Sequence, residues 1–419
     1  MDFECLTASK QPRGLSPLGN FRSSSVFTAG SSKPNLQQNK VLKLSMDCSK
    51  SSFITDIGDG SNVDKVFKQL YPLKIALIGS GNWACAIAYI IGNNVITNYR
   101  FQNEILMYVY EEYYESKKLS TIINETHENP KYLPGHRIPD NIKACSDIET
   151  VVTDADLLMF VLPHQFLRNT CNQIKDHVKS TALALSLIKG FLHDNKNSKS
   201  SVELVSSVIT SILSIPCDVM MGANIANEVA NGELCEATLG SDDINRGYLF
   251  KSLLQAPKFH IRVSTDKSGV EVCGAAKNVV AIGVGMLKGI NQGYCAQALL
   301  MKRGMIEMLI LLKHMLGDKY SPSTIIESCG LADIVASCDQ GRNAHIAEEF
   351  VRSGNNVNWE DLERTLLNGQ KLQGVQTSAM LYEFIANNGL IDCFPLFVQI
   401  QKICIGQAYA NTLIDVLRR

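Results

Sequence analysis

Lys277 stands where a lysine is chemically unusual. Within a predicted helix over residues 269–290 it lies four positions after Cys273, three before Val280 and seven before Val284, so it shares their apolar stripe. A lysine in such a stripe loses hydration, which lowers its pKa and makes it a usable proton donor or acceptor near neutral pH. The alternative is a lysine that extends its ammonium to solvent or pairs with a structural carboxylate.

A second lysine, Lys189, follows an apolar run over residues 182–188 and precedes Gly190. This is the carboxyl end of a predicted parallel strand, and open α/β sheets bind their ligands at that edge. Position alone does not separate a ligand-binding lysine from an ordinary residue that ends a strand.

Asp333 and Arg342 could complete a site with these lysines. Asp333 lies in a mostly apolar segment, where a carboxylate usually needs a partner, and Lys277 is one candidate. Arg342 and Asn343 precede a predicted helix over residues 344–351, and an arginine beside a helix N-terminus can hold a phosphate. Each residue alone is more often structural. Together with the lysines they provide a proton donor, an orienting carboxylate and a phosphate clamp.

A glycine-rich turn follows an apolar run at residues 75–78 and opens a predicted helix: Gly79-Ser80-Gly81-Asn82-Trp83-Ala84. The first glycine permits a tight turn, the second lets the backbone approach a pyrophosphate, and the small Ala84 lets helix and strand pack closely. The pyrophosphate would lie at the positive helix N-terminus. Although G-x-G-x-x-A is common by chance, its strand–turn–helix context predicts a dinucleotide site.

The next predicted strand ends at Tyr110 and Glu111. An acidic residue there can accept hydrogen bonds from the adenosine ribose and would repel a 2′-phosphate, which favours NAD over NADP. A solvated acidic helix start is the alternative interpretation of Glu111.

These residues need a framework that brings strand ends and helix starts together. From residue 74 short apolar runs alternate with helical segments, and the runs occupy residues 75–78, 105–110, 157–162, 182–188 and 219–221. Continuous hydrophobicity predicts strands buried on both faces, as in a parallel sheet covered by helices. We predict an α/β protein in three parts: a disordered or flexible N-terminal extension over residues 1–70, a Rossmann-like doubly wound parallel sheet over 71–264, and an all-α C-terminal domain over 265–419.

The composition argues against other functions. Forty basic and 41 acidic side chains in 419 residues give a formal charge of −1, so no general attraction to nucleic acid or anionic membrane is expected. The 13 cysteines form no C-x-x-C pair and no H-x-x-x-H pair is present, so we predict no metal site and no disulfide framework. His127, His136 and His164 are interpreted as loop residues.

Location is predicted from the same features. Scattered single cysteines favour a reduced compartment, and no apolar stretch approaches the roughly 20 residues that span a bilayer. Residues 1–70 lack the apolar centre of a secretory signal. We expect a cytoplasmic protein, with organellar targeting by the N-terminal extension as the alternative.

Several longer motifs, in order, resemble the cytosolic-type NAD-dependent glycerol-3-phosphate dehydrogenase family. The resemblance runs from about residue 74 to 417. The motifs are the glycine turn itself, HENPKYLPGH at residues 127–136, PHQF at 163–166, SLIKG at 186–190, MGANIA at 221–226, CGAAKN at 273–278, ESCG at 327–330 and NGQKLQG at 368–374.

The resemblance implies reversible hydride transfer between NAD(H) and dihydroxyacetone phosphate, giving sn-glycerol 3-phosphate, in a homodimer formed through the helical domain. It implies that Lys277 is the proton donor and acceptor, that Lys189 polarises the carbonyl and contacts the substrate, and that Asp333 orients the catalytic lysine. Further substrate contacts are implied for four residues: Asn278, Ser337, Arg342 and Asn343. The implied cofactor contacts are Gly79, Ser80, Gly81, Asn82, Trp83, Ala84, Tyr110, Phe166, Ala226, Arg342, Lys371 and Gln373.

The chain departs from the family in three places. Ala84 replaces a glycine, Ser337 replaces a threonine, and residues 293–298 read GYCAQA where the family usually has an Asp-Asn-Thr-Lys segment. The last difference leaves open a catalytically impaired NAD-binding regulatory protein. A related β-hydroxyacid dehydrogenase that acts on a substrate without phosphate is the second alternative.

Overall fold

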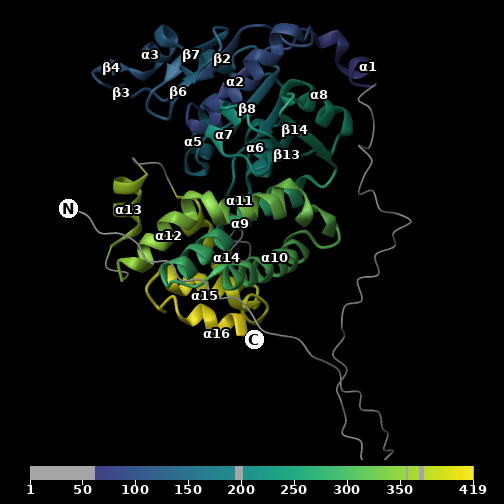
Figure 1. Ribbon diagram of the computed structural model, residues 1–419. Helices are drawn as coiled ribbons and strands as arrows, with labels where there is room; N and C mark the ends of the chain where they lie inside the picture. Colours follow the sequence, from purple (N-terminus) through teal and green to yellow (C-terminus); the bar gives the residue numbers. More distant parts are fainter. Residues whose placement is uncertain (1–61, 194–201, 355–356, 368–371, 419) are drawn as a thin grey trace, which may run out of the picture. The chain divides into compact units, whose positions relative to one another are not determined.

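The structure, a computed structural model, describes residues 62–193, 202–354, 357–367 and 372–418, which all belong to one compact unit. Its N-terminal part contains an eight-stranded sheet in the order β14-β13-β12-β9-β8-β1-β2-β7 (Figure 1). The strands are β1 (Ile75–Ile78), β2 (Ile105–Tyr108), β7 (Ile142–Cys145), β8 (Leu157–Phe160), β9 (Leu183–Ser186), β12 (Cys217–Met221), β13 (Cys235–Gly240) and β14 (Phe259–Ser264). We call β1 to β14, with their helices, the sheet region.

Six neighbouring strands, from β12 to β7, run parallel, and five of them, all but β7, coincide with the predicted apolar runs. The other two strands differ from that prediction, because β13 pairs antiparallel with β12, with Val219 opposite Gly240. The segment between these two strands carries only the five-residue helix α7 (Ala226–Ala230), so the chain turns back beside β12 instead of crossing over the sheet.

The two edge strands, β7 and β14, were not among the apolar runs that predicted strands. Each begins with alternating burial, because Lys143 and His260 are exposed while their neighbours face the core. A strand at the edge of a sheet does not need a continuous apolar run, so that criterion cannot detect it.

Helices cover both faces of the sheet, which confirms the doubly wound arrangement. Within β1, Ile75 and Leu77 join one hydrophobic core, whereas Ala76 and Ile78 join the other. The first core includes α2 (Asn82–Thr97), α3 (Leu119–Thr126), α7 and α8 (Ile244–Leu254), and the second includes α4 (Ile148–Val152), α5 (Leu167–Ile174) and α6 (Val205–Leu213).

Short elements fill the connections of the sheet region. They are α1 (Val63–Phe67), η2 (Lys68–Leu70), β3 (Tyr113–Tyr114), β4 (Lys117–Lys118), β5 (Glu128–Asn129), β6 (Leu133–Arg137), η3 (His164–Phe166), β10 (Phe191–His193) and β11 (Val202–Leu204). Val63 and Phe67 are buried in the first core, so the end of the segment predicted as an extension packs with the sheet region. Residues 1–61 of that segment lie outside the described residues.

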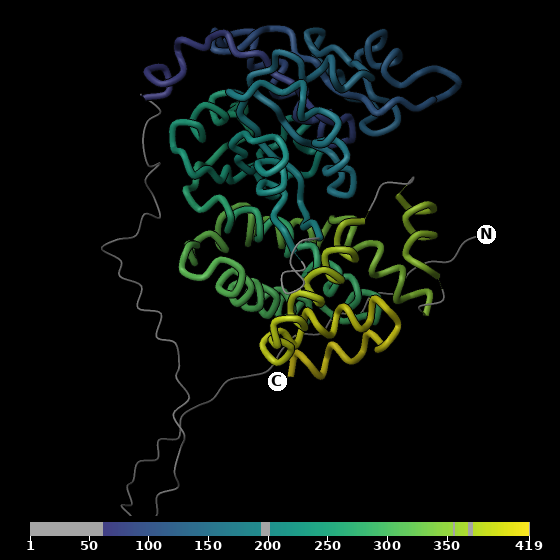
Figure 2. The backbone as a smooth tube through the Cα atoms, turned by 180° about the vertical axis from the view of Figure 1, so that it is seen from behind, coloured from purple at the N-terminus to yellow at the C-terminus, as the bar shows by residue number. Residues whose placement is uncertain are grey.

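The C-terminal part, which we call the helical region, is built around α9 (Lys267–Gly289) and contains no strand among its described residues. Figure 2 shows the purple-to-teal sheet region and the green-to-yellow helices as separate parts of the fold. The other elements are α10 (Tyr294–Leu316), η4 (Pro322–Ile326), the π-helical turn η5 (Ser328–Ala332), α11 (Asp333–Gln340), α12 (Arg342–Arg352), α13 (Trp359–Leu366), α14 (Gly374–Asn387), η6 (Ile391–Cys393), α15 (Pro395–Cys404) and α16 (Thr412–Arg418).

Helix α9 is the core of the helical region. By length and composition alone it could cross a membrane, but it is buried within the protein. Its small residues let neighbours approach closely: a Cβ at Gly285 would lie 2.1 Å from the carbonyl oxygen of Ala344 in α12. The eleven cysteines that the structure describes are all free thiols, and most are buried fillers.

We predict that Gly79→Ala destabilises the fold by at least about 2 kcal/mol. Gly79 has φ +132°, and its Cβ would lie 2.0 Å from the carbonyl oxygen of Val161. Gly81 is the matched control, because it has φ −68° and its Cβ would meet nothing within 4 Å. Urea unfolding followed by circular dichroism should show a lower midpoint for Gly79→Ala only. Equal midpoints for the two variants would contradict this account of the turn.

Candidate active site

Lys277 lies near the middle of α9 and is only 5% exposed. The burial predicted from helical spacing is therefore confirmed. Burial lowers the pKa of Lys277 to about 8, although the charge of Asp333 acts in the opposite direction. An ammonium group with this pKa can release and regain a proton near neutral pH.

Asp333 is the partner of both lysines. Its Oδ1 accepts a hydrogen bond from Lys277 Nζ at 3.0 Å, and its Oδ2 accepts one from Lys189 Nζ at 2.6 Å. The carboxylate is 2% exposed. Burial alone would raise the pKa of Asp333, but the charges of Lys189 and Lys277 outweigh it and hold this pKa below its usual value.

Local structure fixes where Asp333 points. It is the first residue of α11 and follows the π-helical turn η5, a type of turn that often marks functional sites. Ser328, which begins η5, donates a hydrogen bond of 2.6 Å to the carbonyl oxygen of Glu236 in β13. The turn that precedes the carboxylate is thereby attached to the sheet.

Lys189 reaches Asp333 from the sheet region. It follows β9 and also donates a hydrogen bond of 2.7 Å to the carbonyl oxygen of Gly222, which follows the neighbouring strand β12. Lys189 therefore lies at the carboxyl ends of two parallel strands, as the sequence predicts. Its side chain reaches Asp333 in the helical region.

Ser337 lies one turn after Asp333 in α11. Its hydroxyl accepts a hydrogen bond from Lys277 Nζ and donates one of 3.1 Å to Asp333 Oδ1. The structure thus brings together four of the predicted site residues, Lys189, Lys277, Asp333 and Ser337, in one hydrogen-bonded cluster, which we call the lysine cluster. A serine satisfies this geometry, because only the hydroxyl is used.

The predicted phosphate-binding residues lie at the start of α12, which packs on α9. Asn343 Nδ2 donates a hydrogen bond of 3.0 Å to Oδ1 of Asn278, the residue after Lys277. Arg342 is exposed, and an arginine side chain stays charged in proteins. No described side chain caps this helix N-terminus, so its first N–H groups can face an anion.

The glycine turn has the shape that a dinucleotide needs. Gly79 uses a positive φ, and the Cα of Gly81 faces open space. Gly81, the N-cap residue of α2, has no side chain, and Asn82 Oδ1 accepts a hydrogen bond of 2.8 Å from Trp83 N in the first turn. Trp83 packs against Phe259 with ring centroids 6.3 Å apart, so its side chain belongs to the core. This open backbone cradle fits a bound pyrophosphate.

Asn129 is a supporting residue that the sequence did not single out. It is fully buried, and its Nδ2 donates a hydrogen bond of 2.8 Å to the carbonyl oxygen of Ser80 inside the glycine turn. Its Oδ1 accepts a hydrogen bond of 3.2 Å from Tyr132 N. The motif at residues 127–136 contains Asn129, but a loop-like sequence gave no sign of which distant backbone atom it would bind.

The other predicted cofactor contacts belong to several different elements. Tyr110 and Phe166 follow β2 and β8, with 74% and 54% of their surfaces exposed. Ala226 is the buried first residue of α7, and Gln373 immediately precedes α14. Lys371 lies outside the described residues.

Glu111 and the altered segment 293–298 each form hydrogen bonds with residues close by in the sequence. The Glu111 carboxylate accepts a hydrogen bond of 2.7 Å from Ser120 Oγ, so part of its bonding capacity is used within its own segment. In the altered segment 293–298, Tyr294 is 84% exposed, and Gln297 Nε2 donates a hydrogen bond of 2.9 Å to the carbonyl oxygen of Gln292. This segment forms the start of α10.

The three histidines differ from the loop interpretation in two cases. His127 ends α3 in a left-handed conformation, but His136 lies within strand β6, and His164 is buried in η3 with 3% exposure. The prolines and glycine around them suggested loops, yet a short hairpin and a 3₁₀ turn accommodate the same residues. Within the described residues, no three His, Cys, Asp or Glu side chains cluster closely enough to hold a metal ion.

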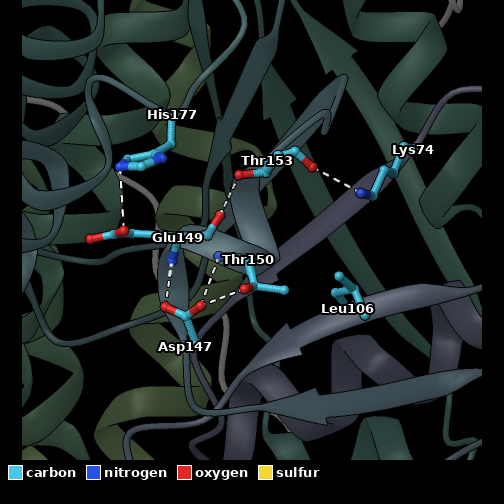
Figure 3. A pocket seen from close by; sticks show the side chains of 7 residues that line it. All are labelled: Lys74, Leu106, Asp147, Glu149, Thr150, Thr153 and His177. Carbon is cyan, nitrogen blue, oxygen red and sulfur yellow. Dashed lines mark hydrogen bonds and ion pairs between the residues drawn. The ribbon is translucent and has the colours of Figure 1, made fainter.

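Figure 3 shows the residues that line a surface hollow. The hollow has a volume of about 400 Å³, and none of its lining residues belongs to the lysine cluster. Lys74, which lines it, precedes β1, whereas the glycine turn follows β1, so the hollow lies toward the opposite edge of the sheet. Several of its polar groups already have partners within the hollow: Lys74 Nζ donates to the carbonyl oxygen of Thr153 at 2.8 Å, and His177 lies 3.4 Å from Glu149. It is not the candidate active site.

Both domains of one protein family match this chain, in the same order. Residues 74–246 match the N-terminus, and residues 266–415 the C-terminus, of NAD-dependent glycerol-3-phosphate dehydrogenase. It is 45% identical over 350 residues to the cytoplasmic glycerol-3-phosphate dehydrogenase [NAD(+)] of Drosophila melanogaster, covering 83% of this chain and 94% of that protein. It is also 45% identical over 347 residues to the human glycerol-3-phosphate dehydrogenase 1-like protein, covering 83% and 97%.

Similar solved structures indicate the same family. The glycerol-3-phosphate dehydrogenase of Plasmodium falciparum superposes with a TM-score of 0.79 at 37% identity, over 85% of this chain and 98% of that one. The enzyme from yeast superposes with a TM-score of 0.73 at 36% identity, over 83% and 100%. The fold class and the family expected from the sequence are confirmed, and the chain belongs to the NAD-dependent glycerol-3-phosphate dehydrogenase family.

Proposed function

We propose that this chain catalyses reversible hydride transfer between NAD(H) and dihydroxyacetone phosphate, giving sn-glycerol 3-phosphate. The observation that carries the proposal is the lysine cluster, where two ammonium groups share one buried carboxylate at the end of the parallel strands. When bound, the nicotinamide of NADH supplies the hydride, and that of NAD accepts it.

The lysine cluster suits a ketone that becomes an alcohol. Hydride arriving at a carbonyl carbon leaves negative charge on oxygen, so a cation held in a dry site stabilises the transition state and can then supply a proton. We assign the proton transfer to Lys277, whose pKa of about 8 fits this task. Lys189 polarises the same oxygen, and Asp333 holds both ammonium groups in place.

Substrate and cofactor are positioned by residues on either side of this cluster. We propose that Arg342 and Asn343 bind the substrate phosphate, with Asn278 and Ser337 lining the pocket. The first turn of α12 joins the lysine-bearing helix through the Asn343–Asn278 hydrogen bond. Binding energy from a phosphate remote from the carbonyl would help to orient the reacting carbon.

The cofactor contacts proposed from the sequence are the glycine turn over residues 79–84, Tyr110, Phe166, Ala226, Lys371, Gln373 and Arg342. The open Cα of Gly81 and the positive φ of Gly79 support the first of these. Neither alternative function is favoured, since the catalytically impaired protein and the β-hydroxyacid dehydrogenase both lack support from the relatives.

Two further properties are proposed by likeness to the relatives. The Drosophila relative is named cytoplasmic, and we propose the same location for this chain. We also propose a homodimer formed through the helical region. Exposed apolar side chains on α10, including Leu299 and Ile306 at 37% and 41% exposure, offer a surface of the kind that a second copy could cover.

The direct test is a steady-state assay of NADH oxidation with dihydroxyacetone phosphate, with NADPH as the comparison. We expect turnover with NADH and a much lower kcat/KM with NADPH. Binding of NADH without turnover would instead support a regulatory protein. Turnover only with an unphosphorylated ketoacid would support a β-hydroxyacid dehydrogenase.

The pKa of Lys277 predicts opposite pH profiles for the two directions. Below a pH of about 8 the amine is protonated and can donate, so kcat/KM for ketone reduction should fall as pH rises through about 8. Alcohol oxidation needs the neutral amine, so its kcat/KM should rise through the same range. Lys277→Met should lose roughly 10²–10⁴-fold in kcat, and its residual rate should lack this titration. Wild-type profiles that are flat near pH 8 would contradict the assignment.

Removing the guanidinium of Arg342 should weaken substrate binding selectively. Because a charged hydrogen-bonded contact contributes about 1.5–3 kcal/mol, Arg342→Ala should raise KM for dihydroxyacetone phosphate by at least about tenfold. Arg352→Ala is the matched control, since Arg352 lies at the other end of α12 and pairs with Glu348 and Glu349. An unchanged KM in Arg342→Ala would argue against the phosphate site.

A further inference from the structure

His164 is a buried imidazole to which the proposed reaction assigns no role. It is 3% exposed and begins η3, the turn that leads from β8 to Phe166. Its Nδ1 is buried and has no hydrogen-bond partner among the described residues. A buried polar atom that stays unpaired has a cost, which raises the question of what the ring does there.

The ring packs against the backbone that carries Lys189. A Cβ at Gly190 would lie 2.9 Å from His164 Nδ1 and 3.2 Å from its Cγ. The imidazole therefore occupies the space beside the Cα of Gly190, and a glycine is what lets the two segments come this close. Because Lys189 directly precedes Gly190, the imidazole ring limits where the lysine backbone can lie.

The same turn is tied to the helical region. Gln165, the neighbour of His164, donates a hydrogen bond of 2.6 Å from Nε2 to Oε1 of Gln376 in α14. Helix α14 begins beside the proposed phosphate site, since Gly374 N donates a hydrogen bond of 3.1 Å to Asn343 Oδ1. The turn with His164 thus lies between the lysine-bearing loop of the sheet region and a helix that is attached to the substrate residues.

The imidazole is suited to act as a neutral spacer. Burial, the largest effect, lowers the pKa of His164 to about 4; the side chain of Gln376 opposes this shift and the charge of His193 adds to it. The ring is therefore uncharged near neutral pH. It adds no positive charge that would repel the ammonium group of Lys189.

We infer that His164 is a positioning residue, which sets the place of Lys189 relative to Asp333 by packing against Gly190. This inference rests on the proposed function, in which Lys189 acts on the carbonyl oxygen. His164 touches no reacting atom in this account. It holds the lysine backbone at the distance from which Nζ reaches Asp333 Oδ2 at 2.6 Å and Gly222 O at 2.7 Å.

A double-mutant cycle on His164 and Gly190 tests the contact. Gly190→Ala pushes a methyl group into the imidazole, and His164→Ala removes the ring that holds the loop, so each should lower kcat by about 10–100-fold through misplacement of Lys189. The double variant should be no slower than His164→Ala, because the added methyl group enters the space that the ring leaves. Such non-additivity is the signature of two residues that act through one contact.

Two further readouts separate positioning from a general loss of structure. KM for dihydroxyacetone phosphate should change much less than kcat, because Arg342 and Asn343, the proposed phosphate contacts, are untouched. His164→Phe, which restores a flat ring of similar size, should recover most of the kcat lost in His164→Ala. Thermal unfolding of each variant identifies any that fails to fold, and the comparison then rests on Gly190→Ala and His164→Phe.

Independent effects that multiply in the double variant, or a change confined to KM, would overturn the inference while leaving the proposed function intact. A wild-type chain without turnover would overturn the proposed function and this inference with it. The two failures are therefore distinguishable in the same experiment.

Discussion

The carboxylate of Asp333 is the interaction on which the candidate site depends. One buried group accepts hydrogen bonds from Lys277 at 3.0 Å and from Lys189 at 2.6 Å, and these lysines belong to the helical and sheet regions respectively. Without it, two ammonium groups would face each other in a place that water barely reaches, which is costly. The π-helical turn before Asp333 and the close packing of α9 both serve to hold this carboxylate where the two regions meet.

How much of this could be predicted from the sequence depends on the range of the contacts. Helical spacing placed Lys277 in a buried stripe, and continuous apolar runs located five of the six strands in the parallel part of the sheet, because both patterns are local. The Lys277–Asp333 ion pair could be suggested only as one possible pair. A buried carboxylate needs a partner, but the sequence does not show which residue that partner is. The motif resemblance supplied the family, which the comparisons confirm.

Contacts between residues that are far apart in the sequence could be found only from the structure. Lys189 and Asp333 are 144 residues apart in sequence, and Asn129 and Ser80 are 49 apart, so no local pattern reports that they touch. His164 was grouped with the loop histidines, whereas it lies in η3 and the surrounding chain buries it. The edge strands β7 and β14 escaped detection for a related reason, because alternating burial at an edge resembles an ordinary polar segment.

The charge of the lysine cluster links stability to chemistry. Two lysines and one aspartate leave one positive charge in excess, although the whole chain carries a formal charge of −1. A buried excess charge is unfavourable, and the protein reduces that cost most easily by letting the more buried lysine lose its proton. Burial is the largest cause of the lowered pKa of Lys277, which the charge of Asp333 opposes and that of Lys189 reinforces, so this pKa expresses the strain of a buried cation. An anionic substrate, or negative charge developing on a carbonyl oxygen, relieves it, so the arrangement that destabilises the empty cluster is the one that favours the transition state.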